Sequence, residues 1–267
     1  MANLRGNIVF TGSVGGLSAY TRKGSDKIIL RTKGGASKDK IKRSAAFANT
    51  RKLNAEFGGA SSAARNIKLA LIGLTHLDHS HFQSRLTAVC SSIQKLDTTN
   101  ELGRRAVLIS GYRQLLEGFN LQMGTGFDSI IKHPLQCSID RDGLSATVLV
   151  PQLFPQISVY VPGRFSLFRL IAVLGVVPDM HYEEGSKKYV PINKKVLVRR
   201  ADLYTEWMGA EDICPQQMLR LQVEGITRIS DHDSLQLSVG VEFGVAVRAD
   251  VIEPVNYAGA AKIMILV

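Results

Sequence analysis

The stretch Leu235-Gln-Leu-Ser-Val-Gly-Val-Glu-Phe-Gly-Val-Ala-Val-Arg-Ala249 places an apolar residue at every second position. Side chains of a β-strand point alternately to the two faces of a sheet, so this period of two predicts a long strand. Shorter runs with strand character lie on both sides of it, at 144–150, 156–161, 165–177, 195–199, 218–223 and 262–267. Turn-forming clusters at 140–143 and 230–233 separate some of these runs. Residues 134–267 are therefore expected to form an antiparallel sandwich or barrel, and we favour a β-sandwich.

The C-terminal run Ile263-Met-Ile-Leu-Val267 differs from the other strands because it has no polar alternation. A strand that is apolar on both sides needs burial on both faces. Left exposed, it would be a site of aggregation. It is therefore expected to be an interior strand of the sandwich.

Residues 37–133 have the spacing of helices. Ser37 can cap a basic helix that is expected to end near Phe57, where Gly58-Gly59 follows. Three further helices are expected at about 61–74, 80–96 and 102–119, each with apolar residues three or four positions apart. The helix at 80–96 would begin with a capping box formed by Ser80 and Gln83. These four helices are expected to pack as a small helical bundle.

Residues 1–36 are rich in glycine and in β-forming residues. Leu17-Ser-Ala-Tyr20 and Lys27-Ile-Ile-Leu-Arg31 flank a loop that contains a glycine, a pattern that predicts a basic β-hairpin. A hairpin of this size is only marginally stable by itself in water, so this arm is expected to pack against another surface. The expected fold class is therefore α+β, with a β-hairpin arm at 1–36, a helical region at 37–133 and a β-sandwich at 134–267.

The charge of the chain is concentrated at its N-terminal end. The 267 residues carry a formal net charge of +10, yet residues 1–70 alone contain fourteen Lys and Arg against three acids. The remaining residues are nearly neutral. Such asymmetry favours an anionic partner, although a solvated basic face that aids solubility is the alternative. The residues expected to contact another subunit or an anion are Arg22, Lys23, Lys27, Arg31, Lys33, Lys38, Lys40, Lys42, Arg43, Arg51 and Lys52.

No motif in the sequence points to an enzyme. The group His76-Leu-Asp78-His79-Ser-His81 could in principle meet zinc or nickel, but it falls between two expected helices, where loop polarity and capping explain it. The carboxylates at 140–143 and 231–233 read as turn chemistry, and Cys90 lies on an apolar helical stripe. The sequence contains neither the Gly-x-Ser-x-Gly motif nor the Gly-Lys-Ser/Thr that ends a phosphate-binding loop. We therefore expect no catalytic residue, no metal site and no cofactor.

The composition is that of a globular protein. Hydrophobic residues make up 45% and charged residues 21%, which excludes disordered and coiled-coil classes. The longest apolar stretch, 165–177, is interrupted by Arg169 and is too short for a transmembrane segment. The first residues do not have the pattern of a secretory signal. The three scattered cysteines fit a reducing compartment, so a cytoplasmic protein or part of an assembled particle is expected.

Several of these segments together are similar to a known family. Gly12-Ser-Val-Gly15, Leu17-Ser-Ala-Tyr20 and Ile29-Leu-Arg31 at the start, with Val239-Gly-Val-Glu-Phe243 near the end, resemble a family of uncharacterised proteins from Bacteroidetes. The resemblance implies the same order of basic hairpin, helical middle and β domain. It implies no activity.

Two function classes remain. The first is a non-enzymatic, self-assembling structural protein, a homo-oligomeric filament, particle or virion-like subunit, that uses its basic arm for subunit contacts. The alternative is a nucleic-acid-binding protein whose arm and first helix contact phosphates. The arm offers only Phe10 and Tyr20 for base stacking, and no nucleic-acid-reading motif is present. The first class is therefore favoured.

Overall fold

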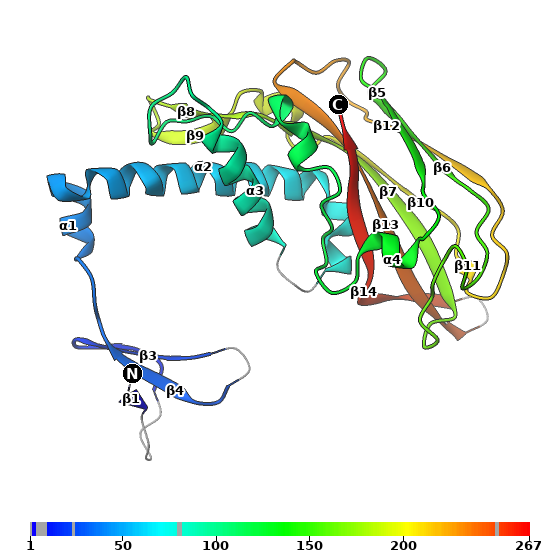
Figure 1. The fold of residues 1–267 in the computed structure, drawn as a ribbon, viewed down its shortest axis with the longest axis horizontal. Coiled ribbons are helices and arrows are strands. Elements are labelled where there is room, and N and C mark those ends of the chain that lie inside the picture. The colour runs from blue at the N-terminus through cyan, green and yellow to red at the C-terminus, as the bar shows by residue number, and fades with distance from the viewer. Residues whose placement is uncertain (1, 4–9, 23–24, 79–81, 249–250) are drawn as a thin grey trace. The chain divides into compact units, whose positions relative to one another are not determined.

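The computed structural model describes residues 2–3, 10–22, 25–78, 82–248 and 251–267. The chain combines helices with antiparallel sheets and divides into two compact units, Met1–Arg51 and Lys52–Val267 (Figure 1). The mixed α and β character expected from the sequence is confirmed. In the described part of the chain, no helix has the length and apolar character needed to cross a bilayer.

The first unit contains a four-stranded antiparallel sheet. Its strands β1 (Ala2–Asn3), β2 (Gly12–Val14), β3 (Leu17–Thr21) and β4 (Ile28–Thr32) lie in the order β1-β4-β3-β2. The expected hairpin is confirmed as β3 and β4, which pair from Leu17 with Thr32 to Thr21 with Ile28. Helix α1 (Lys38–Arg43) follows, and the hydroxyl of its N-cap Ser37 accepts a hydrogen bond from the backbone N–H of Lys40. The predicted cap at Ser37 is thus also confirmed.

Helix α2 (Ala48–Ala70) runs without interruption through Gly58 and Gly59, so the predicted helix end near Phe57 is wrong. The physical reason lies at Gly59. A Cβ atom there would come within 2.7 Å of the Tyr189 ring, so the glycine allows close packing at a buried position inside the helix. Burial of Ala60, Ala63, Ala64 and Ile67 on the same helix outweighs the cost of two helical glycines.

The later helical segments are shorter than expected. A 3₁₀ turn at Ile72–Leu77 follows α2, and α3 (Gln83–Lys95) begins directly after Phe82, whereas Ser80 of the predicted capping box lies outside the described residues. The predicted helix at 102–119 is wrong. That segment holds 3₁₀ turns at Ile109–Gly111 and Arg113–Leu115, because Val107 instead exchanges two backbone hydrogen bonds with Met180. A short helix, α4 (Phe127–Ile130), precedes the strands.

Three antiparallel sheets make up the rest of the second unit. The largest has the order β10-β7-β13-β14, with β11 also paired to β7; a three-stranded sheet has the order β12-β6-β5; β8 and β9 form a hairpin. The strand bounds are β5 Gln136–Asp140, β6 Ser145–Val150, β7 Leu167–Pro178, β8 Met180–Glu183, β9 Lys188–Pro191, β10 Arg200–Tyr204, β11 Met208–Gly209, β12 Gln217–Gln222, β13 Asp233–Arg248 and β14 Val251–Leu266.

Five of the predicted strands, at 144–150, 165–177, 218–223, 235–249 and 262–267, are confirmed as β6, β7, β12, β13 and the last part of β14. The strand predicted at 156–161 is absent, because Gln156 has a positive φ of 60° and the chain turns there. The strand predicted at 195–199 is replaced by a 3₁₀ turn at Lys194–Val196. Local alternation alone could not separate these apolar loops from strands.

The C-terminal strand β14 is the edge strand of its sheet, so its predicted interior position is wrong. It pairs with β13 on one side (Figure 1). On the other side, Gly118, Phe119 and Leu121 form backbone hydrogen bonds with Ile263 and Ala261. Its apolar residues are therefore protected by an irregular segment that covers the edge, a common solution to the hazard of an exposed strand.

The large sheet is buried on both faces. Phe168, Leu170 and Leu174 of β7 share a hydrophobic cluster with inward residues of β6 and β12. Ile171 and Val173, which point to the other face, share a second cluster with residues of α2 and α3. The helical stripes therefore pack against the sheet. The predicted separate helical bundle is wrong for the described residues.

Candidate assembly surface

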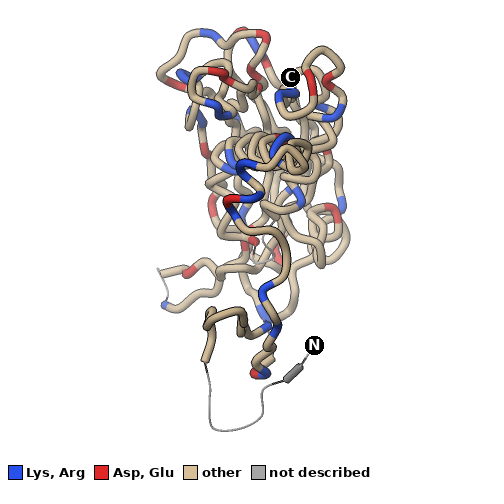
Figure 2. The backbone as a smooth tube through the Cα atoms, turned by 90° about the vertical axis from the view of Figure 1, so that its left-hand side faces the viewer, with Lys and Arg blue, Asp and Glu red and all other residues tan. Residues whose placement is uncertain are grey.

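Among its described residues, the first unit has exposed cations that form no ion pair with a carboxylate. Eight of the predicted contact residues are exposed: Arg22, Lys27, Arg31, Lys33, Lys38, Lys40, Lys42 and Arg43. Within the described ranges, none of the eight forms an ion pair, although Arg31 lies over the Tyr20 ring at 5.5 Å. Figure 2 shows how Lys and Arg recur along this part of the chain. Unpaired exposed cations leave a positive field that attracts anionic groups.

The other three predicted residues behave differently. Arg51 donates two hydrogen bonds of 2.8 Å each to the carbonyls of Ile41 and Ser44, and so satisfies backbone groups at the end of α1. Lys52 forms an ion pair with Glu101 at 3.3 Å. Lys23 lies outside the described residues. Arg51 and Lys52 therefore serve internal contacts.

The sheet of the first unit has almost no core of its own. Where the structure describes side-chain exposure in residues 10–51, only Ala19 is buried. Strand pairing places Val14, Leu17 and Leu30 on the same face as Ala19, and Val14 and Leu17 are 63% and 38% exposed. A sheet needs a hydrophobic face packed against something to be stable in water.

The second unit contains an acidic segment, residues 201–219, which has four acids and no Lys or Arg. Asp202 pairs with Arg200 at 3.0 Å. The other three acids, Glu206, Glu211 and Asp212, are exposed and form no ion pair with any described residue. Sequence analysis missed this segment because the near-zero net charge of residues 71–267 conceals it; a short-window charge count would have found it.

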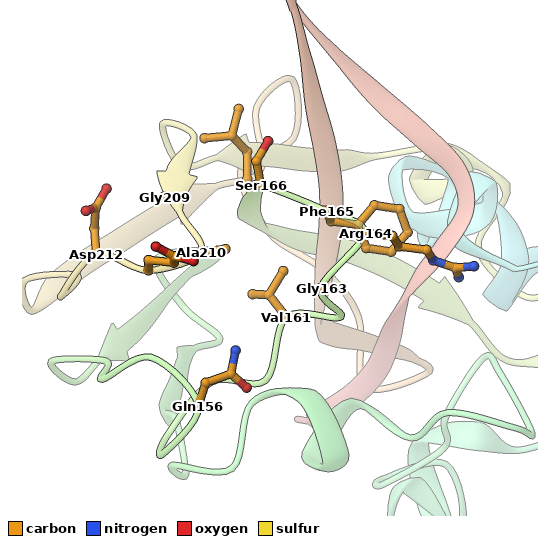
Figure 3. Close-up of a pocket in the computed structure, with 11 residues that line it drawn as sticks. Gln156, Val161, Gly163, Arg164, Phe165, Ser166, Gly209, Ala210 and Asp212 are labelled. Carbon is orange, nitrogen blue, oxygen red and sulfur yellow. The ribbon is translucent and has the colours of Figure 1, made fainter.

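Two of these acids line a pocket of about 660 Å³ (Figure 3). Its walls come from two segments, 156–167 and 209–212. Glu211 and Asp212 belong to one wall, whereas Arg164 belongs to the other and stacks on Phe165 at 4.8 Å. Phe165 in turn stacks on Phe243 of β13, with 4.8 Å between ring centroids. The wall that carries Arg164 is therefore anchored in the core.

Exposed apolar side chains lie on the same two loops. Leu153 and Cys214 exchange two backbone hydrogen bonds of 2.9 Å, which hold the loops together. Next to this bridge, Phe154 and Ile213 are 40% and 58% exposed, and Ile157 is 74% exposed. The surroundings of the pocket thus combine free carboxylates with exposed hydrophobic groups, the composition expected of a protein contact.

A charged cluster lies where β7 and β13 pair. Arg169 Nε donates to Glu242 Oε2 at 2.6 Å, and His76 Nε2 lies 2.6 Å from Glu242 Oε1. The Arg169 guanidinium lies over the rings of Tyr204 and Trp207, at 4.7 and 4.4 Å. Burial raises the pKa of Glu242, but the hydrogen bonds from His76 and Arg169 lower it by more, so the net shift is downward. A carboxylate that stays ionised with both oxygens engaged is suited to holding Arg169 in place.

In the described part of the chain, the cysteines and the His-rich loop form neither a reactive thiol nor a group of metal ligands. Burial raises the pKa of Cys90 to about 12 and that of Cys137 to about 11, which keeps both thiols protonated and poorly nucleophilic. His76 contacts Glu242, whereas His79 and His81 lie outside the described residues. Among the residues that are described, no three His, Cys, Asp or Glu side chains gather in a way that could hold a metal ion.

Comparisons of the chain with models of protein families, with curated proteins and with solved structures find no match.

Proposed function

We propose that this protein is a non-enzymatic structural subunit that assembles with copies of itself into a filament, a particle or a virion-like shell, and that its basic N-terminal arm makes the subunit contacts. The observation that carries this proposal is the sheet of the first unit. It joins an exposed apolar face to unneutralised cations and buries only Ala19 among the side chains described there. Such a segment gains stability when another surface covers it.

The second unit has the features of a body that could carry such an arm. We infer that the β12-β6-β5 sheet and the β10-β7-β13-β14 sheet, whose inward residues share one cluster, form a β-sandwich. Because the large sheet is covered on its other face by the helices, this unit has its own core. It therefore does not need the arm in order to fold.

Sizing of the purified protein, with and without nuclease, tests the proposal. We expect a nuclease-resistant oligomer from the full chain. Deletion of residues 2–36 should abolish the oligomer and leave the circular dichroism of the body intact, because the body keeps both of its hydrophobic clusters.

Two results would contradict the proposal. An oligomer unchanged by the deletion would show that the arm makes no subunit contact. A monomer that carries nucleic acid, and loses it along a steep salt dependence, would instead favour the nucleic-acid-binding alternative.

A further inference from the structure

We propose that the pocket lined by segments 156–167 and 209–212 is the receptor for the basic N-terminal arm of a second copy of this chain. This inference rests on the proposed function and adds the partner surface to it. The partner is identified by charge and by composition, as the following contacts show.

Charge complementarity is the first argument. The exposed cations of the arm and the carboxylates Glu206, Glu211 and Asp212 form no ion pairs with other described residues. These two sets of free charge have opposite signs and lie on the same chain. Complementary patches of this kind steer association and fix the register of a contact.

Composition is the second argument. The arm exposes Val14 and Leu17 on one face of its sheet and Arg31 on the other, and the loops next to the receptor pocket expose Ile157 and Ile213. Each surface therefore offers both a hydrophobic contribution and an ionic one. Area burial supplies the affinity of such a contact, whereas the charges supply its orientation.

The contact joins two different surfaces, so it is heterologous. Every copy would carry one arm and one receptor, and association would continue until a ring closes or a filament grows. This consequence makes the proposal testable with full-length variants that each lack one of the two surfaces.

The receptor variant is Glu211→Lys with Asp212→Lys, and the arm variant is R22E/K27E/R31E/K33E. All six side chains are exposed, so the fold should be kept, and near-ultraviolet circular dichroism checks this. Each variant alone should be monomeric at concentrations where the unaltered protein assembles. Like charges at a contact are costly, and the loss of apparent affinity should be on the order of a hundredfold.

Mixing the two variants is the decisive measurement. The receptor variant keeps a native arm and the arm variant keeps a native receptor, so the mixture should form 1:1 dimers, and only dimers, in analytical ultracentrifugation. The control D142K/D231K makes the same change of charge at exposed turns away from the pocket, and it should assemble normally. Neutral E211Q/D212N should weaken assembly less than the lysine pair.

Three outcomes would overturn the inference. Normal assembly of the receptor variant would show that the pocket is not the receptor, and the proposed function would still stand if deletion of residues 2–36 abolished the oligomer. A mixture that stays monomeric would show that the arm does not dock on a second copy. Loss of assembly in the D142K/D231K control would show that net charge alone governs association.

Discussion

The substitution Arg169→Met should destabilise the second unit by about 3 kcal/mol at pH 7. Arg169 donates to Glu242 at 2.6 Å, and the Glu242 side chain is only 2% exposed. Removing one partner of a buried pair leaves an uncompensated charge, at a typical cost of about 3 to 5 kcal/mol. The lower end applies because His76 still contacts the other carboxylate oxygen. A methionine side chain occupies much of the volume of the arginine methylene groups, so the interaction that is lost is mainly electrostatic.

The effect should depend on pH in a defined direction. In the unaltered protein the pKa of Glu242 is lowered, so its charge contributes stability above the unfolded pKa, and this contribution is lost as the pH falls through the folded pKa. In the variant, burial raises the pKa of Glu242 with less opposition, and protonation relieves the unpaired charge. The stability gap between the two proteins should therefore narrow as the pH is lowered from 7 towards 4.

Urea unfolding followed by far-ultraviolet circular dichroism measures both effects. About 3 kcal/mol corresponds to a fall in Tm of roughly 6 to 12 °C for a unit of this size. Trp207 is the only tryptophan of the chain and lies 4.4 Å from the Arg169 guanidinium, so its fluorescence reports the stack directly. The matched control is Lys52→Met, which breaks an exposed pair with Glu101 and should cost no more than about 1 kcal/mol.

A loss below about 1 kcal/mol for Arg169→Met, equal to that of the control, would refute the reasoning. So would a stability gap that does not change between pH 7 and pH 4. Arg169→Met combined with Glu242→Met offers a further check. Removing both charges should recover much of the lost stability, because no buried carboxylate then remains unpaired.

Two other predictions concern packing. Gly59→Ala should destabilise the protein by about 1 to 3 kcal/mol in urea unfolding, since the new Cβ would meet the Tyr189 ring at 2.7 Å. The control Gly58→Ala faces open space and should be neutral or stabilising by up to about 1 kcal/mol. Equal effects of the two substitutions would contradict this account. Removal of residues 263–267 should leave insoluble protein on expression, because Ile263 and Leu266 belong to the core shared by sheet and helices. A soluble, folded product would show that this end of the strand is dispensable.

The sequence predicts best the features that depend on local period. The alternation at 235–249 and the long apolar run at 165–177 both correspond to strands, and the stripe Ala64, Ile67, Leu71 and Leu74 is fully buried. In each case the pattern repeats long enough to select one conformation. The hairpin of β3 and β4 is of the same kind, because its turn and its strands are adjacent in the chain.

The features that failed depend on distant partners. From the sequence, Gly58-Gly59 predicts a helix end. In the structure, Gly59 makes room for the ring of Tyr189, which is 130 positions away in the chain. Residues 102–119 have helical spacing, yet the Val107 backbone is committed to Met180. The pair of Arg169 and Glu242 also requires the register of β7 with β13, in which these residues are direct neighbours. None of these contacts leaves a signal in the local sequence.

The placement of charge in this chain has a physical consequence for its behaviour in solution. A surface that only needs solubility has both signs interspersed, because large single-sign patches promote association. Among the described residues, eight exposed cations without an ion pair lie in residues 22–43, and three exposed acids without an ion pair lie together in residues 206–212, near exposed isoleucines. Salt screens exposed charges but does not weaken apolar burial. An arm that docks into the pocket should therefore release only in part at high salt, whereas contacts to nucleic-acid phosphates alone should release almost completely.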